Sequence, residues 1–387
     1  MSSSSTHIKP IKPIKILSIG SDRKLFEEGS AVWARMLEYG KLFGEMHIIV
    51  FSLDRLGHAA TKIGDNVWVY PTNSPSRLFY VSDALKMASK VAKEAGLKKE
   101  DTWITVQDPF ESGLVGAMAK WRFGFPLLVQ IHTDFASSNF TSASLLNIIR
   151  SFISRFVMKC SDRVRVVSKR VGEEVARQFR ISQEKITVLP IAVDAEKIAS
   201  LARGSSRQAA SGVLMISRLA PEKDFKTALR AFKMAAGDDE SKRLIIVGDG
   251  PLRESLEEFA EELGLRGRVS FEGWHDDTSH FYSESSEAGI FLSTSLFEGY
   301  GMSLIEAAAA GLAILTTEVG IVGDVLIDGE SCLACPPRDV ECLGVKLKSL
   351  FADEGLRQRL GQEARKSALT HVMGKEEYLR RYAALFE

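Results

Sequence analysis

The sequence predicts an α/β protein built from two doubly wound, Rossmann-like domains. Its 387 residues exceed what one ordinary core holds, and they fit two domains of about 190 residues each. An apolar content of 45% and a charged content of 26% are typical of a globular protein. Short apolar runs alternate with amphipathic helical patterns, as expected for βαβ units around parallel sheets.

The first half of the chain holds one alternating series. Residues 1–13 are rich in Ser, Lys and Pro without an apolar segment, so we expect a disordered tail rather than a signal peptide. Residues 14–192 are expected to form the first domain. Its expected strands are 14–19, 46–52, 68–70, 102–107, 127–131, 163–168 and 186–189. Its expected helices are 30–39, 81–95, 112–120, 142–159 and 171–179.

A second series follows the interdomain crossing near Pro190. Residues 193–370 are expected to form the second domain, and residues 371–387 a last helix that packs back on the first. The expected strands are 213–217, 243–247, 269–271, 289–292 and 313–316. The expected helices are 225–236, 252–263, 302–310, 339–351 and 354–369.

The segment from Glu298 to Glu306 is predicted to be the turn and helix that follow a buried strand. Gly299 and Gly301 permit a tight turn with accessible backbone. A helix that starts near Met302 directs free N–H groups towards a phosphate. Carboxylates beside a phosphate are costly unless they bind sugar hydroxyls, so the pair favours a nucleotide sugar as ligand. An ordinary solvated loop is the alternative.

This segment resembles the E-x7-E element of retaining glycosyltransferases of family 4. These enzymes have the GT-B fold, in which two Rossmann-like domains face each other across a cleft. The resemblance implies that Glu298 contacts the donor sugar and that Glu306 contacts the ribose. It also implies that the donor diphosphate is held by Gly299, Tyr300, Gly301, Met302 and Ser303.

A second motif precedes a predicted helix in the segment Ser217–Asp224. Its cations, Arg218 and Lys223, suit a diphosphate and the negative charge of a departing nucleotide. Ordinary surface charges are the alternative. The segment resembles the R-L-x-x-E-K motif of the same family, which implies that both side chains hold the donor diphosphate.

Three weaker motifs extend the resemblance. Gly248 opens a G-x-G-P loop, which the family places near the nucleotide. Trp274 follows an F-x-G element and is expected to border the base, with a buried structural tryptophan as the alternative. Gly29 lies between the first strand and its helix, where it would let the donor diphosphate or the acceptor come close.

His132 follows the expected strand 127–131. A lone histidine is more often structural, and that alternative stays open. Its position resembles that of the family's active-site histidine, which implies contact with the donor sugar or help in catalysis. His132 and Glu298 are therefore the expected catalytic residues.

Neither a metal nor a cofactor is expected. The sequence contains no Asp-x-Asp, the motif with which many transferases hold a divalent metal. Cys332 and Cys335 form a lone C-x-x-C, and Cys160 and Cys342 do not complete a zinc site. We expect all four to be thiols, as in a reducing cytosol.

The expected partners are a nucleoside-diphosphate sugar and a sugar or lipid-linked glycan acceptor, without nucleic acid. Residues 1–195 contain 27 basic and 19 acidic residues, a charge of +8, and the remainder carries −8. The basic half favours contact with anionic lipid, and chance asymmetry is the alternative. In residues 142–159, apolar side chains recur at helical spacing. Core packing is the favoured interpretation, and peripheral attachment to an anionic membrane is the alternative.

Together these motifs predict a metal-independent, retaining transferase of the hexosyltransferase type. It would move a sugar from a nucleoside-diphosphate sugar to a glycan, lipid-linked or small-molecule acceptor. We expect it in the cytoplasm or peripherally on the inner face of the cytoplasmic membrane. The alternatives are a sugar-nucleotide epimerase or hydrolase of the same fold, and a non-catalytic sugar-nucleotide-binding protein.

Overall fold

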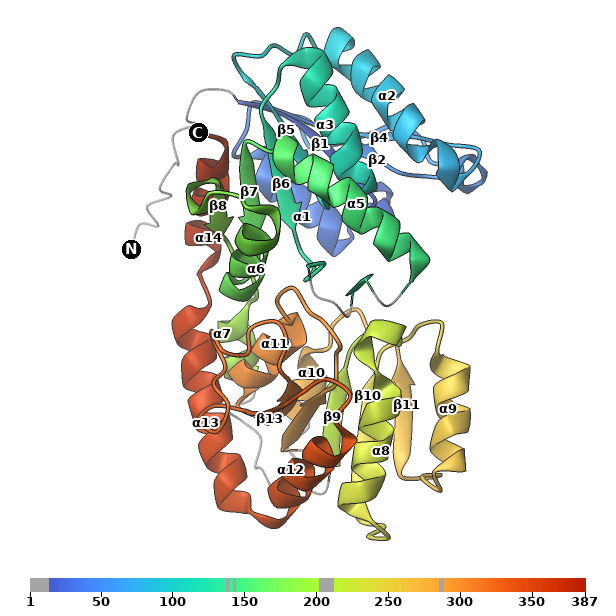
Figure 1. Ribbon diagram of the computed structural model, residues 1–387, viewed down its shortest axis with the longest axis vertical. Coiled ribbons are helices and arrows are strands. Elements are labelled where there is room, and N and C mark those ends of the chain that lie inside the picture. The colour runs from blue at the N-terminus through green and yellow to red at the C-terminus, as the bar shows by residue number, and fades with distance from the viewer. Residues whose placement is uncertain (1–13, 137–139, 142–143, 202–211, 285–288) are drawn as a thin grey trace. The chain divides into compact units, whose positions relative to one another are not determined.

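The computed structural model places the chain in two compact units, each an α/β layer structure around one sheet (Figure 1). It describes residues 14–136, 140–141, 144–201, 212–284 and 289–387. The expected tail, residues 1–13, lies outside the described residues. Unit 1 comprises the chain up to Val167, Gly172–Leu189 and Lys375–Glu387, and unit 2 comprises Ser168–Val171 and Pro190–Gly374.

Unit 1 is built on an eight-stranded sheet of order β3-β4-β2-β1-β5-β6-β7-β8. Its strands pair in parallel, except that β3 is antiparallel to β4. Its central strands are buried, as the apolar runs predicted. The strands are β1 (Lys15–Gly20), β2 (Glu45–Val50), β3 (Thr61–Ile63), β4 (Val67–Pro71), β5 (Thr102–Val106), β6 (Leu127–Ile131), β7 (Arg163–Val166) and β8 (Ile186–Val188).

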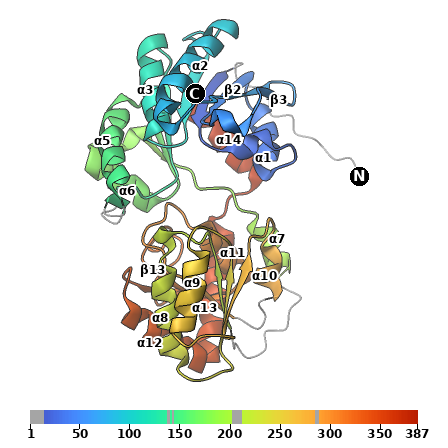
Figure 2. The ribbon, with the colours of Figure 1, turned by 90° about the vertical axis from the view of Figure 1, so that its right-hand side faces the viewer.

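Helices cover both faces of this sheet. Figures 1 and 2 show α2, α3 and α5 on one face and α1 and α14 on the other. The C-terminal helix α14 is fixed by aromatic contacts, with Tyr382 stacked on Tyr39 at 4.5 Å between ring centroids. The helices are α1 (Ala31–Gly40), α2 (Tyr80–Glu94), α3 (Glu111–Phe123), α5 (Leu145–Cys160), α6 (Lys169–Phe179) and α14 (Lys375–Ala383).

Unit 2 has a fully parallel six-stranded sheet of order β11-β10-β9-β12-β13-β14. Its core joins the inner faces of the strands to buried side chains such as Phe232, Leu256 and Leu347. The strands are β9 (Gly212–Ile216), β10 (Arg243–Val247), β11 (Val269–Gly273), β12 (Ile290–Ser293), β13 (Ala313–Thr317) and β14 (Leu333–Cys335).

The helices of unit 2 also form two layers. Figure 2 shows α8, α9 and α12 on one side of the sheet and α7, α10 and α11 on the other. The helices are α7 (Ala195–Leu201), α8 (Phe225–Ala236), α9 (Arg253–Glu262), α10 (Ser279–Glu284), α11 (Met302–Ala310), α12 (Val340–Ala352) and α13 (Glu354–His371). The long predicted elements agree with these bounds within a few residues, whereas β3, β14 and α10 were not expected.

The structure corrects the interpretation of α5 as a helix packed into the core. Only Ser154, Val157 and Met158 of this helix are buried. The apolar side chains on its other side face solvent, with Leu145 80% and Phe152 64% exposed. The 3.6-residue period therefore identified a helix correctly but assigned too many of its apolar residues to the core. Residues 142 and 143, expected at its start, lie outside the described residues.

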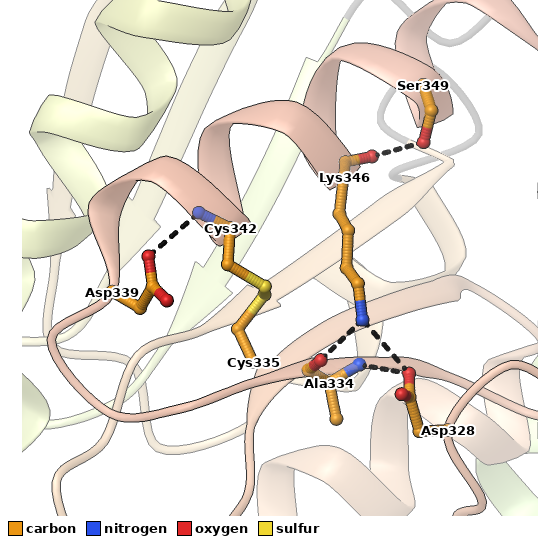
Figure 3. Close-up of a disulfide and its surroundings, with 7 residues drawn as sticks. All are labelled: Asp328, Ala334, Cys335, Asp339, Cys342, Lys346 and Ser349. Carbon is orange, nitrogen blue, oxygen red and sulfur yellow. Dashed lines mark hydrogen bonds and ion pairs between the residues drawn. A yellow bond between two sulfur atoms is a disulfide. The ribbon is translucent and has the colours of Figure 1, made fainter.

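The structure also corrects the expectation of four thiols. Cys335, at the end of β14, forms a disulfide with Cys342 in the first turn of α12, with a Cα–Cα distance of 5.9 Å (Figure 3). The Asp339 side chain accepts a 2.9 Å hydrogen bond from the Cys342 amide and caps the same helix. Cys160 and Cys332 are free cysteines. The disulfide thus ties the last strand of unit 2 to the helix that follows it.

Candidate active site

The strand order of unit 2 reverses between β9 and β12, which lie side by side in the sheet. In open parallel sheets, ligands bind beyond the carboxyl ends of the strands at such a switch point. The loop after β9 carries Arg218 and Lys223, and the loop after β12 carries Glu298. The two strongest sequence motifs therefore meet at the position where this fold forms ligand sites.

Lys223 and Glu298 form an ion pair across the two loops. Both side chains are largely buried, and Ser295 adds a second hydrogen bond by donating its hydroxyl to Glu298 Oε1 at 2.8 Å. The Thr294 hydroxyl holds the other loop by donating to the Lys223 carbonyl at 2.9 Å. The pair thus presents a cation and a carboxylate in fixed positions, one suited to phosphate and the other to sugar hydroxyls.

The turn after Glu298 leads into α11 with a free helix start. Gly301 is the N-cap at a φ of 90°, a conformation that favours glycine, and as a glycine it has no side chain with which to cap the helix. Met302 and Ser303 then form the first residues of the helix, where backbone N–H groups suit an anion. The Gly299 carbonyl is held by a 2.8 Å hydrogen bond donated by the Ser168 hydroxyl.

Tyr300 is buried beneath this turn. Burial, together with the Asp324 carboxylate, raises the pKa of its phenol to about 12, so the side chain is neutral at physiological pH. Its carbonyl accepts a 3.1 Å hydrogen bond from the Ile321 amide. Asp324 in turn forms a 2.8 Å ion pair with Lys169. Tyr300 therefore supports the turn from within, and only its backbone is suited to a phosphate.

Glu306 lies one helical turn further along α11. Its carboxylate accepts a 2.8 Å hydrogen bond from the Tyr282 hydroxyl of α10. Burial raises the pKa of Glu306, the Tyr282 hydrogen bond opposes that rise, and Asp277 adds to it. This hydrogen bond engages Oε2 of Glu306. Tyr282 thus orients the Glu306 carboxyl group. Because this carboxyl group is buried, further hydrogen bonds from hydroxyl groups, such as those of a sugar, would stabilise it.

Gly248 brings the end of β10 against the loop after β9. Its φ is 136°, and a Cβ atom there would lie 2.0 Å from the Ser217 carbonyl oxygen. Arg218, on that loop, forms an ion pair with Glu222 and its side chain remains 65% exposed.

Trp274 follows β11, is 59% exposed and donates its indole N–H to Asp276 at 3.1 Å. The alternative of a buried structural tryptophan is therefore wrong.

His132 and Gly29 belong to unit 1. His132 follows β6, and its Nε2 lies 3.3 Å from the Gln107 side-chain oxygen, at the end of β5. Burial, together with the nearby Arg165 and Arg35 cations, lowers the pKa of His132 to about 3, so the imidazole is neutral at pH 7. Gly29 lies before α1 with open space at its Cβ position.

The structure thus brings together Lys223 and Glu298, and it places Glu306 and the 299–303 turn on the same loop and helix. Sequence reasoning did not identify Ser295, Tyr282 or Ser168 as supporting residues. Ser295 lies three positions before Glu298 and had only that proximity as a signal. Within the described ranges, no group of three or more His, Cys, Asp or Glu side chains is arranged to hold a metal ion.

Two models of glycosyltransferase families together match most of the chain. Residues 205–367 match the family model "Glycosyl transferases group 1", and residues 42–197 match "Glycosyltransferase Family 4". Among curated proteins, a glycogen synthase of Mycobacterium tuberculosis is 26% identical over 245 residues, 63% of this chain. This chain spans only 58% of that relative's length.

Solved structures show the same fold. Sucrose-phosphate synthase from Thermosynechococcus elongatus has a TM-score of 0.77 at 18% identity, over 96% of this chain and 98% of its own. Anabaena HepE in complex with UDP and glucose has a TM-score of 0.71 at 18% identity, with the same coverage. Two parallel-sheet units, two family models and these neighbours agree: the chain belongs to glycosyltransferase family 4 and has the GT-B fold.

Proposed function

We propose that this protein is a retaining glycosyltransferase that takes its sugar from a nucleoside diphosphate sugar bound to unit 2. The observation that carries the proposal is the Lys223–Glu298 pair at the β9/β12 switch point, beside the uncapped start of α11. Membership of family 4 and the UDP and glucose in the HepE structure support it.

Each group of the site has a proposed role. Arg218, Lys223 and the N–H groups at the start of α11 hold the diphosphate and offset its negative charge as the glycosidic bond breaks. Glu306 accepts hydrogen bonds from the ribose hydroxyls, and Glu298 accepts them from the donor sugar. The exposed ring of Trp274 and the Gly248 loop border the base. These contacts fix the donor and stabilise the leaving group without a metal.

The proposed reaction replaces the nucleotide by an acceptor hydroxyl on the same face of the anomeric carbon. The C–O bond to the diphosphate breaks, the bond to the acceptor oxygen forms, and the acceptor proton passes to a phosphate oxygen. His132 is proposed to act in this transfer step as a neutral imidazole, and Gly29 to allow close approach of the donor. The acceptor is a glycan, a lipid-linked glycan or a small molecule. We propose a cytoplasmic enzyme with peripheral membrane contact.

The proposal predicts that charge at Glu298 is required for turnover but not for folding. In Glu298→Gln the amide oxygen still accepts from Ser295, whereas the charge opposite Lys223 is lost. We expect Glu298→Ala and Glu298→Gln to lower sugar transfer by about 100-fold or more. The assay follows nucleotide release from UDP-, GDP- and ADP-sugars in the presence of an acceptor panel.

A matched control separates this effect from general loss of charge. Glu257 of α9 is paired with Arg253 on the surface, so Glu257→Gln removes an ion pair outside the site. We expect its turnover to equal that of the wild type. Undiminished turnover in Glu298→Ala would refute the assignment. Donor cleavage that needs no acceptor would instead support a hydrolase or epimerase, and donor binding without any turnover would support a non-catalytic binding protein.

A further inference from the structure

Two neighbouring helices of unit 1, α3 and α5, expose several large apolar side chains. On α5, exposed residues recur three or four positions apart, so they lie on one side of the helix. On α3, the exposed Trp121 is 91% accessible. We call this surface the α3–α5 face; it comprises Trp121, Leu145, Ile148, Ile149, Phe152 and Phe156. A folded protein rarely exposes so many large apolar side chains together without a partner.

The two helices are in contact and lie side by side on the same face of the unit 1 sheet (Figures 1 and 2). Near the start of α3, Glu111 forms an ion pair with Arg150 of α5, at 3.0 Å between Oε1 and Nε. Near its end, Lys120 donates to the Cys160 carbonyl at 2.9 Å. These two contacts are nine positions apart on α3 and ten positions apart on α5, so the helices run in the same direction. The first turn of α5 therefore extends beyond the start of α3 and carries Leu145 and Ile148 with it.

The charge on these helices is mainly positive. Helices α3 and α5 contain five Lys or Arg residues and one carboxylate, Glu111, which pairs with Arg150. Three of these cations, Arg122, Arg155 and Lys159, are exposed and form no ion pair within the described part of the chain. The Arg155 guanidinium lies 5.4 Å from the centre of the Phe152 ring, so cationic and apolar groups alternate on the same face.

We propose that the α3–α5 face docks on a lipid bilayer that contains anionic headgroups. Apolar side chains in this arrangement enter the boundary between headgroups and acyl chains, while the three unpaired cations meet lipid phosphates. The inference does not depend on the transfer reaction of unit 2. No helix within the described residues is long and apolar enough to cross a membrane, so the contact is along the surface.

The charge pattern favours a bilayer over a second copy of this chain. In a two-fold symmetric dimer the same patch faces itself. Arg122, Arg155 and Lys159 would then approach their own counterparts, because the one carboxylate on these helices, Glu111, already pairs with Arg150. Juxtaposed like charges oppose such an interface. An anionic membrane satisfies both the apolar and the cationic parts of the face.

Sedimentation with lipid vesicles tests this inference on the full chain. The probes are vesicles of phosphatidylcholine alone and of equal parts phosphatidylcholine and phosphatidylglycerol. We expect the wild type to bind the anionic vesicles, and to bind them less as salt rises. The double variant Phe152→Ser/Phe156→Ser and the double variant Arg155→Glu/Lys159→Glu should each weaken binding by about tenfold or more.

An exposed apolar residue and an exposed cation on unit 2 serve as a control outside the α3–α5 face. Val345 and Lys348 are exposed on α12, and Val345→Ser/Lys348→Glu should bind anionic vesicles as the wild type does. Sedimentation velocity of the same proteins reports the oligomeric state. Absence of wild-type binding, or equal binding by all variants, would overturn the proposal. So would a wild-type dimer that the Phe152→Ser/Phe156→Ser variant converts to monomer, since the face would then join two copies.

Discussion

At the scale of single residues, burial shifts the pKa values of two candidate groups in opposite directions. It lowers the pKa of His132 because it desolvates the charged imidazolium, and it raises the pKa of Glu306 because it desolvates the charged carboxylate. His132 is consequently a neutral donor or acceptor at pH 7. Glu306 keeps its orientation through the Tyr282 hydroxyl. Both shifts arise from position in the fold rather than from neighbours in the sequence.

The lowered pKa of His132 predicts a pH-dependent loss of stability. The unfolded chain binds a proton at this residue below about pH 6.5, whereas the folded chain does so only near pH 3. The free energy of unfolding therefore falls as the pH drops between these values, by at most about 1.4 kcal/mol per pH unit. Urea unfolding at pH 7 and pH 5 should show a loss that is smaller in His132→Gln by up to about 2 kcal/mol.

Comparison of variants isolates this contribution, since burial also lowers the pKa of His47 in every one of them. His371 is exposed on α13, and His371→Gln should keep the wild-type pH dependence. An identical pH dependence in His132→Gln and wild type would show that His132 takes up its proton in the folded protein as readily as in the unfolded chain.

The sequence predicted those candidate site residues whose motifs are local. Glu298 and Glu306 belong to one loop–helix segment, and Lys223 belongs to the loop–helix segment after β9. Their supporting groups come from elsewhere in the chain: Tyr282 is 24 residues from Glu306, and Ser168 is 131 residues from Gly299. Such contacts depend on tertiary structure, and no pattern in a single sequence predicts them.

At the scale of elements, the spacing of apolar residues predicted where helices and strands occur. It did not predict which of their side chains are buried. α8 and α11 were predicted with correct bounds because each has strong periodicity and a clear end, such as Gly311 after α11. Strands β3 and β14 have three residues each, too few for a period to be detected. The apolar positions of α5 surround much of the helix, and sequence alone does not say which of them meet the core.

The C-terminal segment is predicted to stabilise unit 1 strongly. The Phe386 side chain is buried, and its ring meets the edge of Phe43 at 5.1 Å between centroids. Phe386→Ala leaves a cavity at this contact, and we expect a loss of about 3–5 kcal/mol in the free energy of unfolding. Urea unfolding measures it. The same exchange at the exposed Phe156 of α5 should cost little, and a similar cost at both positions would contradict the proposed packing.

At the scale of the whole molecule, each unit repeats the same construction with different chemistry. Both sheets reverse their strand order at one point, between β1 and β5 in unit 1 and between β9 and β12 in unit 2. The β9/β12 position holds the Lys223–Glu298 pair. The residues before 196 carry a charge of +8 and the remainder −8. The donor site and the lipid-binding face proposed above thus belong to different units.

The last prediction concerns where a nucleotide binds in the complete chain. UDP, or the matching GDP or ADP, should raise the melting temperature by mass action. At about 100 times Kd the stabilisation is about 2.7 kcal/mol, or about 5–10 °C for a domain of this size. Because Arg218, Lys223 and the α11 start are proposed to hold the diphosphate, the shift should persist in EDTA. Hydrogen exchange should slow in residues 217–224 and 298–306 and stay unchanged in β14. A shift that disappears with EDTA would place a metal in the donor site, and protection confined to unit 1 would move the nucleotide away from the Lys223–Glu298 pair.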